Sequence, residues 1–325
     1  MTVADNLQDR MRVACVGGVN HDIRGHASAP LERGTSNSGT VSRDVGGVAG
    51  NIARSLAGVD VAAAIFSVVG DDAAGRAITA VLQRDGVDTE HLRIRPAVRT
   101  STYLALLDEV GELVGAVADM EAMEHADVGW IERIEPVLAG FDTWVVDTNL
   151  PAAALDRLLA TRPPGVTVLA DPVSAAKATR VRRLLSHIDV LTPDRSEAAA
   201  LCGRNIEDIA GARAAATTLV RAGAGVVLLK LGADGLILAD GSGTTHLPPI
   251  TPNRVVDVTG AGDALAAGYL YGVAIGAGDP VRWGLAAASL TVESRRSVSD
   301  ELSVAALGRR VGAGGYVAGG IVVHR

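Results

Sequence analysis

An aspartate that follows three small residues is the part of this sequence best suited to catalysis. Asp263 comes directly after Gly260, Ala261 and Gly262, and an apolar helical pattern runs from this point through residue 270. Small residues let successive backbone N–H groups converge at a helix N-terminus, where they stabilise negative charge. Such a site suits phosphoryl transfer, with the carboxylate accepting a proton from a hydroxyl group. An aspartate in a first helical turn can also simply complement the helix dipole, and this segment alone does not decide between the two.

Polar groups follow the first predicted strand of the chain. Residues 11–18 form an apolar run that ends in two glycines, which predicts a buried strand and a turn. Asn20 and Asp22 come just after it, and open α/β sheets bind ligands at this end of their strands. A second glycine turn leads into a helical pattern, a geometry that binds anions or hydroxyl groups. Its candidate binding residues are Gly46, Gly47 and Asn51.

Strand-like and helical segments alternate along most of the chain. Apolar residues recur at helical spacing in segments 73–84, 152–160 and 206–222. Short apolar runs that predict strands lie at 62–69, 143–147, 166–171, 189–192 and 225–230. Such alternation implies right-handed crossovers and an α/β fold, with a mainly parallel central sheet covered by helices on both faces.

Two segments interrupt this alternation. Residues 23–44 are rich in Gly, Ser, Thr and Asn and suggest short strands, whereas residues 99–120 contain two strand-like runs around a polar turn, which predicts a β-hairpin. We expect these two segments to form a small β-sheet lid over the ligand-binding end. The core would comprise residues 11–22, 45–98 and 121–325, without a linker that separates a second domain.

The composition disfavours several other classes of protein. A chain of 325 residues can bury a large core, and an aromatic content of only 3% favours an α/β fold over an aromatic-rich β-sandwich. The net charge of −7 argues against a general nucleic-acid-binding protein, which needs a basic surface. No unbroken apolar run reaches the roughly 20 residues that cross a bilayer, so we expect a cytoplasmic protein without a membrane partner. Cys15 and Cys202 are predicted to be core thiols, with a single disulfide as the alternative.

Residues 257–270 match, position by position, the second signature of the ribokinase-like carbohydrate and nucleoside kinases, the phosphofructokinase-B family. The turn that contains Gly46, Gly47 and Asn51 resembles the first signature of this family, and the resemblance covers nearly the whole chain after residue 11. It implies a ribokinase-like three-layer α/β/α domain with a small β-sheet lid. The activity that it implies is the ATP-dependent phosphorylation of a small sugar or nucleoside.

The resemblance also implies roles for the residues introduced above. Asp263 would be the general base, and the backbone of the three small residues before it would form the anion hole. Asp22, together with Asn20, would hold the hydroxyl groups of the sugar. The residues of the first signature would hold the same sugar from its other side.

Metal sites are implied by resemblance as well. Asp194 and Glu197 resemble an Asn-x-x-Glu motif whose glutamate organises Mg²⁺ through water, although Asp194 replaces the asparagine of the family. A solvated helix N-terminus is the alternative for both residues. The backbone oxygens of Asp257 and Thr259 would help to bind a monovalent cation, K⁺.

The implied nucleotide site lies further along the chain. Lys230, Gly232 and Gly235 resemble the turn at which the family binds ATP, although a β-hairpin turn has a similar sequence. A helix that contains Ala288 would form a wall for the adenine. The chain lacks a Gly-x-x-x-x-Gly-Lys-Ser/Thr motif, so a P-loop is not the source of phosphate binding.

Several segments resemble the pseudouridine kinases within this family. They are residues 20–25, 35–39, 98–103, 118–120, 170–177 and 290–294. The uracil of pseudouridine keeps both ring N–H groups free, so its recognition needs hydrogen-bonding side chains in the lid. Lys177 is a further candidate for contact with substrate or phosphate, with a solvated lysine as the alternative. The lid candidates, for which turn formation and β-propensity are alternative explanations, are Ser36, Asn37, Thr102 and Tyr103.

These observations predict a kinase that uses ATP, Mg²⁺ and K⁺ to phosphorylate the 5′-hydroxyl group of pseudouridine. A ribokinase, or a kinase of inosine, adenosine or uridine, is the alternative on the same framework. A catalytically silent nucleoside-binding regulator is the alternative from another class. A lid sheet with an exposed apolar face often pairs with a copy of itself, which predicts a homodimer through the lid.

Overall fold

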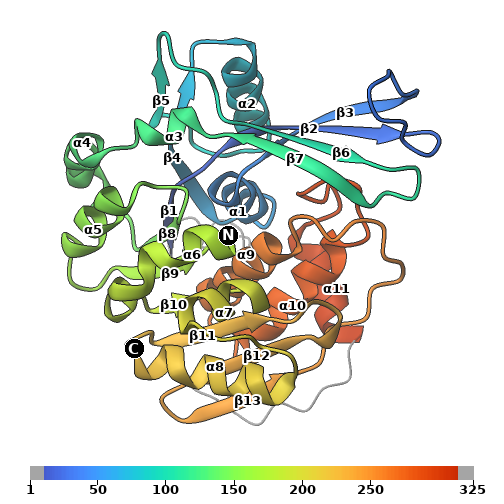
Figure 1. Ribbon diagram of the computed structural model, residues 1–325. Coiled ribbons are helices and arrows are strands. Elements are labelled where there is room, and N and C mark those ends of the chain that lie inside the picture. Colours follow the sequence, from blue (N-terminus) through green and yellow to red (C-terminus); the bar gives the residue numbers. More distant parts are fainter. Residues whose placement is uncertain (1–10, 314–325) are drawn as a thin grey trace.

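A computed structural model describes residues 11–313 and shows three layers (Figure 1). The middle layer is a nine-stranded sheet that is parallel from β11 to β5 and has two antiparallel strands, β12 and β13, at one edge. In spatial order the strands are β13 (Gly243–Leu247), β12 (Leu236–Asp240), β11 (Val226–Lys230), β10 (Val190–Leu191), β9 (Thr167–Asp171), β8 (Thr143–Asp147), β1 (Arg12–Val16), β4 (Ala62–Gly70) and β5 (Leu92–Arg95).

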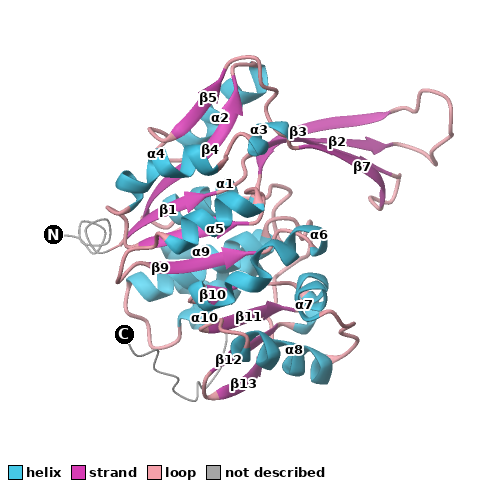
Figure 2. Cartoon of the chain, turned by 60° about the vertical axis from the view of Figure 1, so that its left-hand side comes forward, coloured by secondary structure: helices cyan, strands magenta, loops and turns pink. Residues whose placement is uncertain are grey.

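Helices cover both faces of this sheet, with one apolar core on each side (Figure 2). The first core is closed by α1 (Val48–Ala57), α2 (Ala73–Arg84), α9 (Ala261–Ala274), α10 (Pro280–Thr291) and α11 (Val304–Ala313). The second is closed by α3 (Glu121–Glu124), α4 (Val128–Leu138), α5 (Ala152–Ala160), α6 (Ala175–Ala178), η2 (Thr179–His187), α7 (Arg195–Cys202) and α8 (Ile209–Arg221). Because the central strands are buried on both faces, they are almost continuously apolar.

This architecture confirms the predicted α/β/α fold with a mainly parallel sheet and a small second sheet. The helices predicted at 73–84 and 152–160 coincide with α2 and α5. Both cysteines are free thiols, so the alternative of a disulfide is wrong; Cys15 is buried and Cys202 is partly exposed. Within residues 11–313, no helix has the length and apolar character required to span a bilayer.

Close packing of α9 against α10 positions the segment that carries Asp263. Gly268 faces α10, where a Cβ atom would lie 2.5 Å from the carbonyl oxygen of Trp283 and 2.7 Å from Cβ of Ala287. The absence of a side chain at Gly268 therefore lets the two helices approach closely. The N-terminus of α9 is held at the ligand-binding end of the sheet by this contact and by α1 on its other side.

The lid is a four-stranded sheet in the order β3-β2-β6-β7. It projects from the end of the core toward which the parallel strands point (Figure 2). Its strands are β2 (Asn20–Ala27), β3 (Gly39–Gly46), β6 (Thr102–Leu107) and β7 (Leu113–Asp119). Strand β2 starts at Asn20 because it pairs with β3 up to Gly46, so the lid strands extend beyond the predicted segment 23–44 at both ends.

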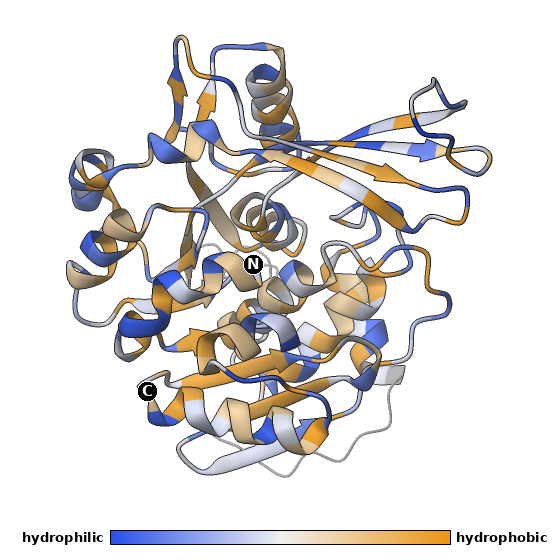
Figure 3. Cartoon of the chain, viewed as in Figure 1, coloured by the Kyte–Doolittle hydropathy of each residue, from blue (hydrophilic) through white to orange (hydrophobic). Residues whose placement is uncertain are grey.

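Register divides the lid residues between two faces. Asp22 lies beside Tyr103, and Arg24 lies on the same face, which is turned toward the core. The opposite, outer face carries several exposed apolar side chains, and Figure 3 colours much of β6 and β7 orange. Its exposed apolar side chains include Val41, Leu104, Leu106 and Val117.

Candidate active site

Asp263 lies in the first turn of α9 and contacts α1. Asn51 Nδ2 donates a hydrogen bond of 2.8 Å to Asp263 Oδ2. The N-cap of α9, Gly260, has a φ of 79°, and a Cβ atom there would overlap the carbonyl oxygen of Ser297. Only glycine fits this left-handed position. The N–H groups of Gly262 and Asp263 have no acceptor within the helix, so they are free to bind an anion.

Other charged groups surround this aspartate. Lys230 Nζ lies 2.8 Å from Asp171 Oδ2, and the same lysine is close to Gly262, where a Cβ atom would lie 3.1 Å from Nζ. Burial raises the pKa of Asp263 to about 8, and the charge of Asp171 adds to this rise, whereas Asn51 and Lys230 oppose it. Burial acts to lower the pKa of Lys230, but Asp171 and Glu197 outweigh burial and raise it. A pKa of about 8 favours the protonated carboxyl group of Asp263 at neutral pH.

Asp147 and Asp171 were not among the predicted site residues, yet both lie at the centre of the site. Asp147 is fully buried at the end of β8, where its carboxylate accepts hydrogen bonds from the N–H groups of Gly18 (2.8 Å) and Ala49 (3.0 Å). It thus joins the two glycine turns, although burial raises the pKa of Asp147 against these hydrogen bonds. The available signal was position, because each aspartate ends a predicted buried strand at the ligand-binding edge.

Asn20 and Asp22 lie together at the start of β2, as predicted. Asn20 Nδ2 donates to Asp22 Oδ1 at 2.7 Å, and burial raises the pKa of Asp22. A Cβ atom at Gly46 would overlap the carboxylate of Asp22, and one at Gly47 would lie 2.8 Å from Asn20 Oδ1. The two glycines thus leave room for both polar side chains.

Asn51 connects this group to Asp263 and keeps one atom free. Its Oδ1 is buried and has no hydrogen-bond partner in the described part of the chain. A buried acceptor without a donor is costly, so this atom is well placed to receive a hydroxyl hydrogen from a ligand.

The four lid candidates are not brought together. Tyr103 shares the inner face with Asp22, whereas Thr102 lies on the outer face and donates from its hydroxyl to the carbonyl oxygen of Thr100 at 3.1 Å. Ser36 and Asn37 are exposed in the β2–β3 loop. The side chain of Asn37 folds this loop through hydrogen bonds to the backbone of Glu32 (2.8 and 2.9 Å). Of the four, Tyr103 is the side chain that the structure directs toward the site.

Asp194 and Glu197 form a capping box at the start of α7. Asp194 Oδ1 accepts from the N–H of Glu197, and Glu197 Oε2 accepts from the N–H of Asp194, both at 2.8 Å. Aspartate and asparagine are equally good N-caps, which explains how Asp194 can replace an asparagine. Glu197 is also buried near Lys230 and Asp171, and burial raises its pKa to about 7 while Lys230 opposes the rise.

The remaining nucleotide candidates lie around this region. Gly232 and Gly235 both have positive φ, 61° and 86°, and form the tight connection η3 (Gly232–Asp234) between β11 and β12. Ala288 is partly buried on α10. Lys177 is half-buried and donates to Asn149 Oδ1 at 2.6 Å, and burial lowers its pKa.

Asp257 connects the lid to the turn before α9. Its Oδ2 accepts from Arg24 of β2 at 2.8 Å, and its Oδ1 accepts from the N–H (2.9 Å) and hydroxyl (2.7 Å) of Thr259. The carboxylate is therefore fully engaged, which leaves backbone oxygens as the donors for a cation. The carbonyl oxygen of Ser297 also approaches this turn at Gly260. A set of carbonyl oxygens suits a monovalent cation, so the residues present fit the predicted K⁺.

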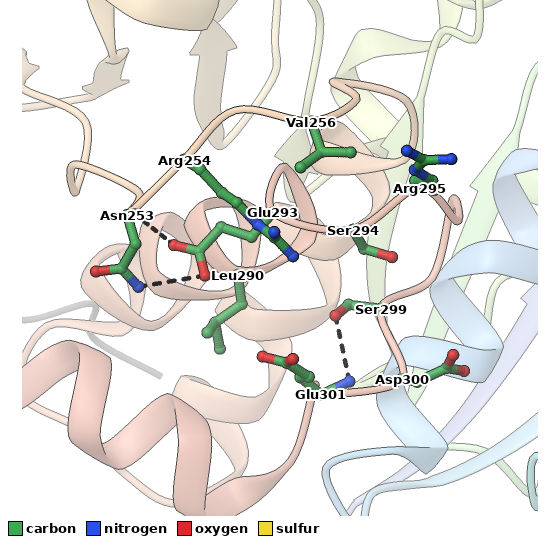
Figure 4. Close-up of a pocket in the computed structure, with 10 residues that line it drawn as sticks. All are labelled: Asn253, Arg254, Val256, Leu290, Glu293, Ser294, Arg295, Ser299, Asp300 and Glu301. Atoms are coloured by element: carbon green, nitrogen blue, oxygen red, sulfur yellow. Dashed lines mark hydrogen bonds between the residues drawn. The ribbon is translucent and has the colours of Figure 1, made fainter.

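A cavity of about 480 Å³ lies beside this turn (Figure 4). It opens between the loop before Asp257, the end of α10 and the loop that follows α10. None of the predicted site residues lines it. Its lining consists of Asn253, Arg254, Val256, Leu290, Glu293, Ser294, Arg295, Ser299, Asp300 and Glu301.

The fold and the site together define an α/β phosphotransferase that acts on a hydroxyl group. Residues 10–303 match the pfkB family carbohydrate kinases, and the chain belongs to this family. It is 30% identical to the pseudouridine kinase of Escherichia coli K12 over 303 residues, which cover 92% of this chain and 96% of that protein.

Solved structures agree with this assignment. A carbohydrate kinase from Agrobacterium tumefaciens superimposes with a TM-score of 0.79 at 29% identity, covering 93% of this chain and 97% of that one. The Arabidopsis thaliana ribokinase complexed with ribose and ATP has the same fold, with a TM-score of 0.79 at 22% identity, covering 93% of this chain and 98% of that one. The protein is thus a sugar or nucleoside kinase of the pfkB family.

Proposed function

We propose that this protein transfers the γ-phosphoryl group of ATP to the 5′-hydroxyl group of pseudouridine, with Asp263 as the general base. The observation that carries the proposal is the hydrogen bond between Asn51 and Asp263 at the free N-terminus of α9, since it combines a base with an anion site. The similarity to a pseudouridine kinase over 92% of the chain supports the substrate.

In the proposed mechanism the sugar lies between the lid and α1. Asp22 and Asn20 bind its secondary hydroxyl groups, and the free Oδ1 of Asn51 accepts a further hydroxyl hydrogen. The 5′-oxygen gives its proton to Asp263 and forms a bond to the γ-phosphorus, while the bond from that phosphorus to the leaving ADP oxygen breaks. The N–H groups of Gly262 and Asp263 stabilise the charge on the transferred group.

Two metal ions belong to the proposal. Glu197 would hold Mg²⁺ through water with its Oε1, because Oε2 is engaged in the capping box, and this ion would neutralise charge on the phosphates of ATP. The backbone oxygens of Asp257 and Thr259 would hold K⁺ beside the anion hole. Lys230 and the turn that contains Gly232 and Gly235 would contact ATP, with Ala288 at the adenine.

The inner face of the lid would recognise the uracil through hydrogen bonds. Uracil linked through carbon presents two N–H donors and two carbonyl acceptors. Arg24 and Tyr103 share this inner face with Asp22. The guanidinium group of Arg24 donates, and the hydroxyl group of Tyr103 both donates and accepts. Closure of the lid would also keep water from the γ-phosphate.

Replacement of the base tests this assignment. Asp263→Asn should lower kcat by about 10³-fold or more and leave nucleoside binding, measured by calorimetry, nearly unchanged. Asp279→Asn, which changes an aspartate that caps α10, serves as a control for the loss of a carboxylate. An Asp263→Asn enzyme that keeps most of its activity would show that another group is the base.

A substrate panel tests the nucleoside. Pseudouridine, uridine, inosine, adenosine and ribose should be compared with ATP by kcat/KM, and pseudouridine should give the highest value. A preference for ribose or adenosine would reject pseudouridine but retain the kinase. Failure to turn over any of the five would favour the silent regulator.

We also propose that two copies pair through the outer face of the lid. The side chains of Leu104 and Val117 are directly paired across β6 and β7 and are 46% and 65% exposed, which leaves an apolar surface open to solvent. Such a surface on a sheet is typical of a contact between subunits.

A further inference from the structure

Basic side chains gather between the edge strand β5 and the α3–α4 corner, beside the base of the lid. Arg93 pairs with Val68 of β4, and Val68 belongs to the apolar core that also contains Met123 of α3 and Trp130 of α4. Because paired residues of adjacent strands point to the same face, Arg93 and, two residues on, Arg95 are directed toward α3 and α4. Figure 1 shows β5, α3 and α4 next to one another at this edge of the core.

Two side chains from the helical side lie near these arginines. Arg95 Nη2 lies 3.4 Å from His125 Nδ1, and arginine has only donors, so Nδ1 is the acceptor and the Nε2–H of His125 is free to donate. Arg133 belongs to α4 and folds back toward the first turn of that helix, where its Nη1 lies 3.7 Å from the place of a Cβ atom on Gly129. The positive end of α4 thus adds to the charge of the arginines.

The positive charges of this group are only partly balanced by carboxylates. Arg93 Nη1 is buried and has no hydrogen-bond partner in residues 11–313. Over the same range, Arg93, Arg95 and Arg133 form no ion pair, although the chain as a whole is acidic. Asp127 is nearby, but its Oδ1 is used to cap α4 through the N–H of Trp130 at 2.8 Å.

Burial and the repulsion between like charges both act on the pKa of Arg93. Burial lowers the pKa of Arg93, and the charges of Arg133 and Arg95 lower it further, whereas the charge of Asp127 opposes this shift. A charged donor that is buried without an acceptor is costly, so a bound anion would relieve both the missing hydrogen bond and the repulsion.

We propose that Arg93, Arg95 and Arg133, with His125, form a binding site for a phosphate group that is separate from the catalytic site. Guanidinium groups match the geometry of phosphate oxygens through paired hydrogen bonds, and several of them together favour a tetrahedral, multiply charged oxyanion over a single carboxylate. The overall charge of −7 disfavours a long polyanion such as nucleic acid, so the ligand is a small one.

Titration calorimetry with inorganic phosphate at constant ionic strength tests this site. Arg93→Gln and the more exposed Arg133→Gln should each weaken phosphate binding by about tenfold or more, because each removes charge-assisted hydrogen bonds. Arg221→Gln, at an exposed arginine of α8, removes the same charge elsewhere and should leave binding unchanged. Equal affinity in all three variants and the parent would overturn the proposal.

Hydrogen exchange then locates the bound ion. Phosphate should protect residues 92–95 and 121–133, whereas protection confined to residues 257–263 would assign it to the anion hole and refute the separate site. A comparison with ribose 5-phosphate distinguishes the two sources of the ligand: tighter binding than that of the free ion identifies a phosphomonoester, and weaker binding identifies phosphate itself. None of these measurements requires turnover, so the site is tested independently of the proposed function.

Discussion

Asn51 and Asp263 are separated by 212 positions in the chain, yet their side chains share a hydrogen bond of 2.8 Å. This contact determines how easily Asp263 can act as a base. Burial and the charge of Asp171 raise the pKa of Asp263, and Asn51 and Lys230 act to lower it. Activity should therefore depend on pH in a way that these neighbours control.

We predict that kcat/KM rises with pH until about 8, since Asp263 must lose its proton before it can accept one. Below this value each pH unit should lower kcat/KM by about tenfold. The effect on stability has the opposite sign: unfolded aspartate ionises near pH 4, so the folded state loses stability as pH rises from about 4 to about 8. Initial rates between about pH 6 and pH 9 provide the measurement. A kcat/KM value that does not fall below pH 8 would mean that Asp263 is already ionised in the free enzyme.

Asn51→Ala should move the rise of kcat/KM to higher pH, because it removes a hydrogen bond that lowers the pKa of Asp263. Ser55→Ala, one turn further along α1, changes a buried hydroxyl group that makes no hydrogen bond in the described chain. It should leave the pH at which kcat/KM rises unchanged. An identical shift in both variants would point to a general loosening of α1.

The sequence predicted Asp263 as the candidate base but not the groups that shift its pKa. Asp263 belongs to a compact signature, and its neighbours in the chain are sufficient to recognise it. Asp147 and Asp171 come from separate strands and acquire their roles only when parallel strands align their ends. Ser36 and Asn37 show the reverse, since turn-forming residues can satisfy their own loop and never reach a ligand.

Among the elements, β2 and the turn before α9 are joined by the ion pair of Arg24 and Asp257. We predict that Arg24→Ala raises KM for the nucleoside by about two- to fivefold, because a partly exposed ion pair contributes little more than this. Arg24→Lys should recover part of the loss. Arg43→Ala on β3, whose side chain is paired in register with Ile23 of the outer face, is the control. Equal KM values for Arg24→Ala and the parent would show that this ion pair does not hold the lid in its binding position.

The contact of α9 with α10 gives a prediction of stability. Gly268→Ala should destabilise the protein by about 1–3 kcal/mol, since the new Cβ would press against α10. Gly308→Ala on α11 meets no atom within 4 Å and should stabilise by about 0.5–1 kcal/mol through helix propensity. Urea denaturation measures both changes. A neutral Gly268→Ala would show that the two helices can separate without cost.

The elements were predictable to different degrees. Helices α2 and α5 follow directly from apolar spacing, because their buried faces repeat every three to four residues. The strand predicted at 189–192 is shorter in the structure, Val190–Leu191, although the N–H groups of Asp189 and Thr192 still donate to carbonyl oxygens of β9. The ends of the lid strands depend on pairing with distant segments, which no local pattern encodes.

For the molecule as a whole, the outer face of the lid makes the assembly testable. Leu104→Lys combined with Val117→Lys should convert a dimer into a monomer, because two charges would be buried in the contact. Val273→Lys changes an exposed valine of α9 and should leave the dimer intact. Sedimentation velocity distinguishes the species. A parent protein that is monomeric at micromolar concentration would contradict the proposed pairing.

The order of the lid strands has a consequence for redesign. Its two halves meet through the parallel pair β2–β6, while the whole segment that includes α1, β4, α2 and β5 lies between them in the chain. A different specificity therefore cannot be transplanted as one contiguous cassette. Residues 20–46 and 102–119 would have to be exchanged together, and a chimera that carries only one of them would join half of a recognition surface to a foreign partner.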